Sequence, residues 1–485
     1  MKKIIFIIII CCLLYAPALN NYFSSDDWYH LRLGQINSIQ EFLNFFSFTP
    51  TPQTASFYRP LSTQVFFFIM QKVFGLWPLP WYLITNFFFG LSIYLVYLLT
   101  SKLIVNLKLS HFNLSKTQNF SLLTAFFYGF SVTHFTHLYF LSTFQEILMV
   151  IGINLAFIKY LQHKKILVIF FWIIALLSKE TAIVLPALIV MYELIITPKL
   201  QFSRQRILQI LTQILPLIAI SFIYIILRFQ IFVPIGGDSY VWDFSPIRAI
   251  NTFFWYTIWS IGVPEMIVDF IGSGFQPIPR FYTAFGNWWI IVTIGYISNI
   301  LLITVLFIKQ YKQINKLLIF GSLWFAISLS PFLFLPWHKF SLELGLPMIG
   351  FAIILAWLIF NHVFLGKFFL IIWIIFNLLM NIMTYQHHYT TQRSIITHKV
   401  TTFFQTNYPK FPNNQVWFTS QNNSNNSPWG GEATQVAHSI NRSELFKVLY
   451  NNHDINVYFQ GIDDIQLMPH DAIQINANQF LKQHE

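Results

Sequence analysis

The chain has 485 residues, of which 55% are hydrophobic, 19% are aromatic and only 10% are charged. This composition excludes an ordinary soluble globular domain and indicates a protein that lies mostly in lipid. The formal charge of +11 comes from basic residues spread along loops, without an aromatic-lined basic patch, so no nucleic-acid partner is expected. The two cysteines, Cys11 and Cys12, are adjacent in one apolar run, where they point apart and predict no disulfide.

The first twenty residues fit two descriptions. Lys2 and Lys3, a short apolar stretch and Ala16-Pro17-Ala18 resemble a cleavable signal peptide. We favour a retained first span, because the segment after it carries a strongly polar motif that must be held at the membrane surface.

Apolar runs recur along the chain and predict membrane-spanning helices of about 17 to 25 residues. Eleven spans are expected, at residues 4–19, 82–101, 119–138, 143–161, 166–178, 181–197, 207–232, 286–308, 317–335, 344–361 and 368–384. We expect a multi-pass protein of the plasma membrane. With Lys2 and Lys3 on the cytoplasmic side, this topology places the C-terminus outside.

The charged residues sort by side under this topology. The inner loops hold basic residues and no acid: Lys102, Lys108, Lys116, Lys164, Lys165, Lys199, Arg204, Arg206, Lys309, Lys312, Lys316 and Lys367. Before the tail, every acid except Glu193 falls at or near the outer face: Asp26, Asp27, Glu41, Glu146, Glu180, Asp238, Asp243, Glu265, Asp269 and Glu343. Because acids contribute little to topology, their collection on one side indicates chemistry there.

Two outer segments are long, at residues 20–81 and 233–285, and long loops are usually functional. Leu61–Phe74 in the first segment is apolar but contains polar residues, and Ile250–Val263 in the second segment is similar. Both predict helices that lie in the membrane interface. Whether Ile250–Val263 crosses the membrane is left open.

The chain becomes polar and Asn-rich after Tyr385, which predicts a boundary between a membrane domain, residues 1–385, and a soluble outer domain, residues 386–485. Patterning in the tail predicts a small α/β domain. Its expected elements are strands Gln415–Thr419 and Asn456–Phe459, helices Glu432–Ile440 and Ser443–Asn451, and a loop Ser420–Gly431.

Asp26-Asp27-Trp28 directly follows the first span. Adjacent carboxylates at a membrane surface are costly to desolvate without partners. The structural alternative is an exposed N-cap of the next helix, because Ser and Asp cap helices well.

Tyr58-Arg59-Pro60 lies in the same outer segment. A residue before proline is extended, and a guanidinium at headgroup level suits bidentate contact with phosphate. The alternative is an arginine that anchors an interfacial helix.

Two further cationic motifs lie at the outer boundary. Ser178-Lys179-Glu180 interrupts two apolar runs, either as a self-paired ion pair in a tight turn or as a site where Lys179 meets a lipid phosphate and Glu180 orients it. His338 and Lys339 add positive charge to the same face, unless Lys339 only extends to the surface.

The combination is more informative than any single motif. A carboxylate with several cations at one face is what glycosyl transfer from a phosphate leaving group requires, because the carboxylate accepts the proton of the acceptor hydroxyl and the cations stabilise the departing phosphate. Nucleotide sugars are generally absent outside the cytoplasm, so the donor must be lipid-linked.

These motifs resemble, in order and spacing, those of the GT-C class of membrane glycosyltransferases, which includes protein O-mannosyltransferases and the aminoarabinose transferase of lipid A. The matching stretches are Asp26-Asp27-Trp28, Tyr58-Arg59-Pro60-Leu61-Ser62, Ser178-Lys179-Glu180-Thr181-Ala182 and Leu335-Pro336-Trp337-His338-Lys339. The similarity covers residues 1–385. The tail resembles no family and lacks the tetratricopeptide repeats of some relatives, so a protein acceptor is not carried over.

The resemblance implies an all-α, GT-C-like membrane domain that transfers a sugar with inversion from a polyprenyl-phosphate donor to an extracytoplasmic protein, lipid or envelope glycan. It implies Asp26 or Asp27 as the base and Trp28 and Tyr58 nearby. The residues implied near the donor phosphate are Arg59, Lys179, Glu180, His338 and Lys339.

Metal use is left open by the resemblance, since some relatives use a divalent cation and others do not. Asp26 and Asp27, with Asp238 or Asp243, are the oxygen ligands that the chain offers to Mg²⁺ or Mn²⁺.

Two other classes of protein share this hydrophobic composition. A lipid flippase or small-solute transporter would place ionisable residues at mid-membrane depth and show paired repeats. An envelope assembly protein would leave the charges at one face unexplained. We therefore favour the transferase.

Overall fold

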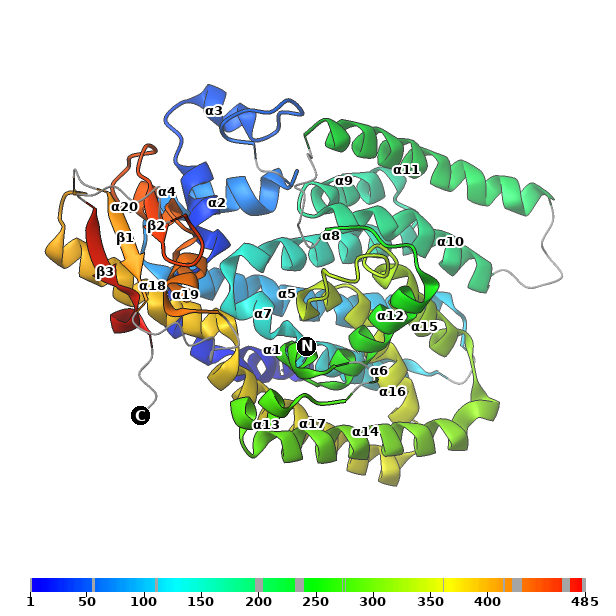
Figure 1. The fold of residues 1–485 in the computed structure, drawn as a ribbon. Helices are drawn as coiled ribbons and strands as arrows, with labels where there is room; N and C mark the ends of the chain where they lie inside the picture. Colours follow the sequence, from blue (N-terminus) through cyan, green and yellow to red (C-terminus); the bar gives the residue numbers. More distant parts are fainter. Residues whose placement is uncertain are drawn as a thin grey trace.

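The fold is mostly helical, as expected, with one small sheet at its edge (Figure 1). The structure is a computed structural model that is 75% helical. It describes residues 2–54, 57–109, 112–196, 204–231, 240–272, 274, 276–360, 362–412, 415–420, 430–464 and 472–481.

The α-helices of the part preceding the tail are α1 Lys2–Leu14, α2 Asp26–Gly34, α3 Ile39–Asn44, α4 Phe66–Phe74, α5 Pro78–Asn106, α6 Leu114–Phe130, α7 Phe135–Tyr139, α8 Phe144–Leu161, α9 Lys165–Leu176, α10 Leu185–Ile196, α11 Arg204–Ile231, α12 Pro246–Ile261, α13 Pro279–Phe285, α14 Trp288–Gln310, α15 Lys316–Leu329, α16 Pro347–Phe360 and α17 Val363–His387. Short turns of 3₁₀-helix connect many of them, including η1 Ala16–Asn20, η3 Val132–His134, η4 Leu141–Thr143, η5 Glu180–Val184, η7 Glu265–Phe270, η9 Tyr311–Gln313 and η10 Ser341–Leu344.

Five helical segments of the described residues are long and apolar enough to cross a membrane: Pro78–Asn106, Leu141–Leu161, Arg204–Phe229, Trp288–Gln313 and Phe364–Asn407. Two of these segments, α11 and α14, run along opposite sides of the molecule in Figure 1. They expose Leu215, Phe222, Ile294 and Leu301. Such uncovered apolar faces indicate association with a membrane.

The expected count of eleven crossings goes beyond these five segments and stays a prediction. Each predicted span overlaps a helix, but α9, α15 and α16 have only 12 to 14 residues. At 1.5 Å per residue they cover about 20 Å, against about 30 Å for the hydrocarbon core of a bilayer.

In two predicted spans the helix ends six or more residues earlier than expected. Helix α6 stops at Phe130 and not at residue 138, because Ser131 is extended and its hydroxyl caps η3. Helix α15 stops at Leu329 and not at residue 335, because Pro331 lacks the N–H that the next helical turn needs and its ring would clash with the carbonyl group of Ile327. After α6 the chain continues in the short elements η3 and α7, whereas residues 330–340 after α15 contain no helix.

The two predicted interfacial segments are helical. Leu61–Phe74 forms most of η2, a π-helix at Pro60–Val65, followed by α4. Ile250–Val263 largely corresponds to α12, which ends at Gly262 with a φ of 127° that favours glycine. Neither belongs to the five long apolar segments.

The tail contains a parallel three-stranded sheet in the order β2-β1-β3, with strands β1 Val416–Thr419, β2 Val457–Phe459 and β3 Ile473–Asn476. Val416 is in register with Val457 and with Ile473. The accompanying helices are α18 Tyr389–Asn407, α19 Glu432–Ile440, α20 Glu444–Leu449 and the 3₁₀ turn η12 Ala477–Phe480.

The predicted strands β1 and β2 and helices α19 and α20 are confirmed, whereas β3 was not expected. Most of the predicted loop Ser420–Gly431 lies outside the described residues. Helix α17 runs two residues past the predicted boundary at Tyr385. The sheet and its helices lie at one end of the long helices, beside α2 and α4 (Figure 1).

Helices α15 and α16 pack closely through two glycines, a device typical of membrane helices. A methyl group on Gly350 would lie 2.4 Å from the Gly321 carbonyl oxygen and 2.7 Å from the Phe325 nitrogen. Since both are backbone atoms, they cannot move without displacing a helix.

We therefore expect Gly350→Ala to lower the stability of the purified protein by about 1–3 kcal/mol, through overpacking. Thermal unfolding in detergent, followed by size-exclusion chromatography, measures the effect. Gly431→Ala is the matched control, because a methyl group there would meet nothing within 4 Å and the backbone φ is −64°. Equal melting temperatures for the two variants would contradict the packing argument.

Candidate functional site

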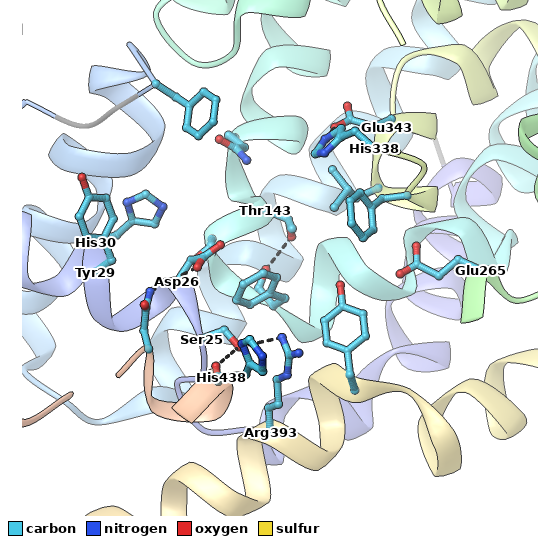
Figure 2. A pocket seen from close by; sticks show the side chains of 18 of the residues that line it. Ser25, Asp26, Tyr29, His30, Thr143, Glu265, His338, Glu343, Arg393 and His438 are labelled. Atoms are coloured by element: carbon cyan, nitrogen blue, oxygen red, sulfur yellow. Dashed lines mark hydrogen bonds and ion pairs between the residues drawn. The ribbon is translucent and has the colours of Figure 1, made fainter. Parts of the chain in front are cut away.

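A cavity of about 840 Å³ lies where residues 20–81, the loop before α16 and the C-terminal domain meet (Figure 2). Nine charged residues line it: Asp26, Arg59, Lys179, Glu265, Asp269, Lys339, Glu343, Arg393 and Arg442. Of the predicted site residues, Asp26, Arg59, Lys179, His338 and Lys339 line the cavity. Asp27, Trp28, Tyr58 and Glu180 are not part of its lining.

Asp26 is the first residue of α2, so its side chain lies at a helix N-terminus, which favours negative charge. Figure 2 shows Asp26, Tyr29 and His30 on one side of the cavity, with His338 and Glu343 on the other. The Asp26 side chain is exposed, and it lines the cavity. Desolvation there raises its pKa above the usual value, and Arg393 opposes the rise.

Asp27 is fully buried and points away from the cavity. Its Oδ2 accepts a hydrogen bond from the Ser24 N–H at 3.0 Å, and its Oδ1 accepts from the N–H and hydroxyl of Ser142 at 2.8 and 2.6 Å. Burial raises the pKa of Asp27 to about 7, although these hydrogen bonds lower it. Asp27 thus joins α2 to η4, and only Asp26 of the two acids is available to a substrate.

Trp28 and Tyr58 support the walls of the cavity. The Trp28 ring is fully buried and packs edge-on against Phe23, 5.8 Å between centroids. The Tyr58 ring stacks on Phe48 at 4.2 Å, and its hydroxyl donates to the carbonyl oxygen of Phe46 at 3.1 Å.

Arg59 forms a two-point ion pair with Glu180. Its Nε and one terminal nitrogen donate to the two carboxylate oxygens at 2.7 and 2.6 Å, and its other terminal nitrogen donates to Gln145 at 2.7 Å. Arg228 of α11 lies 3.2 Å from the same carboxylate. Desolvation would raise the pKa of Glu180, but Arg228 and Arg59 outweigh it and hold the pKa well below its usual range.

Lys179 lies between two carboxylates. Its Nζ donates to Glu146 of α8 and to Glu343 at 2.6 Å, and all three side chains are at most 3% exposed. This differs from the expectation that Glu180 would orient Lys179. Desolvation raises the pKa of Glu343, but Lys179 and His338 outweigh it and lower the pKa to about 2.

His338 and Lys339 complete this side of the cavity. The His338 Nε2 lies 3.4 Å from Glu343, and its ring lies against Tyr240, 4.1 Å between centroids. The Lys339 Nζ donates to the side-chain oxygen of Asn251 at 3.4 Å. Unlike Arg59 and Lys179, Lys339 has no carboxylate within 4.0 Å in the part of the chain that the structure describes.

The acids expected to bind Mg²⁺ or Mn²⁺ do not converge. Both oxygens of Asp27 are occupied by hydrogen bonds, Asp243 pairs with Arg248 at 2.6 Å, and Asp238 lies outside the described residues. Among the residues that are described, no three His, Cys, Asp or Glu side chains are arranged to hold an ion. The residues present therefore do not fit a metal site at Asp26 and Asp27.

Several cavity residues were not predicted. The Glu265 carboxylate accepts two hydrogen bonds from Ser341, each 2.6 Å, and contacts His388 at 2.9 Å. The sequence held a signal for Glu265, because the predicted topology places it among the acids at the outer face. Arg393 and Asn441 had no such signal, because they belong to the polar tail and reach the cavity only when the tail packs on α2.

No protein-family model, curated protein or solved structure matches this chain. The GT-C resemblance therefore rests on the motifs quoted above alone.

Replacing Lys179 by methionine would leave Glu146 and Glu343 buried together without their cation. We expect Lys179→Met to lower stability by about 3–5 kcal/mol at neutral pH. The loss should shrink as pH falls, because protonation removes the uncompensated charges. Melting temperatures measured between pH 5 and 8 test this, with Lys339→Met as the control. A loss independent of pH would argue against the ion group.

Proposed function

We propose that this protein is an integral membrane glycosyltransferase that transfers a sugar from a polyprenyl-phosphate donor to an extracytoplasmic acceptor, with inversion at the anomeric carbon. The observation that carries the proposal is the shared cavity, which has an accessible carboxylate, Asp26, facing a wall that contains Lys339, Lys179 and His338. The GT-C resemblance of the motifs supports the same reaction.

Asp26 acts as the base in this reaction. Its carboxylate takes the proton of the acceptor hydroxyl while the acceptor oxygen bonds to the anomeric carbon of the sugar. The bond between that carbon and the phosphate oxygen breaks, and the polyprenyl phosphate leaves with the electron pair. A carboxyl group whose pKa is raised by desolvation is a stronger base than one in water, which suits Asp26 for the task.

Two kinds of cation assist the leaving phosphate. Lys339 and Arg393 line the cavity and, among described residues, have no carboxylate within 4.0 Å, so neither is held in a direct ion pair. Arg59 and Lys179 are already compensated by Glu180, Glu146 and Glu343. Together with His338 they shape the wall of the cavity.

The location follows from the same arrangement. The C-terminal domain borders the cavity, and we expect a lipid-linked donor to present its phosphate there while its chain stays in the bilayer. Under the predicted topology this end is the outer face of the plasma membrane.

The test compares Asp26→Asn and Asp27→Asn in nanodiscs, with a radiolabelled polyprenyl-phosphate hexose or pentose and a crude envelope acceptor. We expect Asp26→Asn to be as stable as the natural protein and to lose at least about 100-fold in rate, since general-base catalysis is worth 10²–10⁴. Asp27→Asn turns an amide toward backbone N–H donors and should lose about 1–3 kcal/mol of stability.

The folded fraction of Asp27→Asn should retain transfer. An active Asp26→Asn variant beside an inactive but folded Asp27→Asn variant would show that the base is misassigned. No transfer by the natural protein with any donor tested would contradict the proposed function.

The rate should also depend on pH in a definite direction. The base must be ionised, so transfer should rise with pH through the Asp26 pKa, whose midpoint lies above 3.8, the usual value for aspartate. Initial rates at constant ionic strength between pH 4 and 8 measure the profile. A rate that falls as pH rises over this range would contradict a carboxylate base.

A further inference from the structure

The C-terminal domain forms one wall of the cavity. Arg393 of α18 and His438, Asn441 and Arg442 at the end of α19 line it together with Asp26. Figure 2 shows Arg393 and His438 beside Ser25 and below Asp26. Residues more than 360 positions apart in the chain therefore meet at the start of α2.

The contact fixes a strained residue. Ser25 has φ 50° and ψ −124°, a region that non-glycine residues rarely occupy and that costs free energy unless the surroundings hold it. Its N–H donates to the Ser439 carbonyl oxygen at 2.6 Å and its hydroxyl donates to the His438 carbonyl oxygen at 2.9 Å. Because Ser25 precedes Asp26, α19 sets the direction in which Asp26 leaves the backbone.

Asn441 then contacts the carboxylate itself. It ends α19 in the left-handed conformation, φ 51° and ψ 56°, which asparagine tolerates better than most residues. Its side-chain Nδ2 donates to the Asp26 Oδ1 at 3.3 Å. The other oxygen, Oδ2, has no hydrogen-bond partner among the described residues, so it is the oxygen that can accept a proton.

We propose that Asn441 is a positioning residue for Asp26, so that the C-terminal domain completes the catalytic site. The amide orients the carboxylate through Oδ1, leaves Oδ2 toward the cavity and favours the ionised form, because a hydrogen bond donated to a carboxylate stabilises its charge. The catalytic role of this arrangement rests on the proposed function, whereas the effect of Asn441 on the ionisation of Asp26 does not.

The test measures Asp26 ionisation directly. A water-soluble carbodiimide activates protonated carboxyl groups, which glycine methyl ester traps, and peptide mass spectrometry quantifies labelling at Asp26 as a function of pH. Asn441→Gly keeps the left-handed backbone while removing the amide. We expect the midpoint of labelling to rise by about one pH unit. Asn441→Asp should raise it further, because a second carboxylate repels the first.

Asn451→Gly is the matched control. Asn451 is an exposed, left-handed asparagine of the same domain, φ 48°, far from the cavity lining. Its replacement should leave the midpoint unchanged and should match Asn441→Gly in melting temperature. An unchanged midpoint in folded Asn441→Gly would overturn the proposal.

Transfer gives a second measurement. At pH values below the natural midpoint, Asn441→Gly should be about tenfold slower than the natural protein, and its rate should recover toward the high-pH plateau. If the natural protein transfers no sugar but the labelling midpoint still rises, the proposed function fails while the positioning role stands. If transfer occurs and the midpoint does not move, the positioning role fails alone.

Discussion

A lysine held between two buried carboxylates organises the cavity side of this protein. Lys179 joins Glu146 of α8 to Glu343 of the loop before α16, and His338 extends the group from that loop. Three ionisable groups with almost no exposure are tolerated because the Lys179 ammonium group donates to both carboxyl groups. The next residue, Glu180, holds Arg59 and Arg228. The adjacent residues Lys179 and Glu180 thereby join the segment of residues 20–81, α8, α11 and the loop before α16.

The motifs contain residue types that are typical of a catalytic site, but this ion network also gives them a structural role. Arg59 and Lys179 were expected to hold a phosphate as free cations, yet each already faces acid. Their charge therefore contributes to the shape and potential of the cavity wall. The cations left to meet an anion, Lys339 and Arg393, come from a loop and from the C-terminal domain.

The adjacent acids Asp26 and Asp27 illustrate how one helical step separates two roles. Successive residues on a helix point about 100° apart, so when Asp27 turns inward to Ser142, Asp26 faces the cavity. The buried acid ties α2 to the membrane domain, and the accessible acid can react. The C-terminal domain then sets the orientation of the accessible acid, through Ser25 and Asn441.

The sequence by itself determined the helical and strongly apolar character of the chain, two of the three strands of the tail, and the set of polar motifs, because these follow from composition and local periodicity. It placed Asp26, Arg59, Lys179, His338 and Lys339 near one another on the basis of charge sorting, together with Asp27 and Glu180. The first five line the cavity, and the last two do not. Helix ends at Phe130 and Leu329 were predicted too late, because local capping and proline override an apolar run. Only the tertiary structure decided the partners of each charge, the division of labour between Asp26 and Asp27, and the entry of Arg393 and Asn441 into the cavity, since contacts between residues hundreds of positions apart depend on how helices and domains pack and leave no periodic trace in the chain.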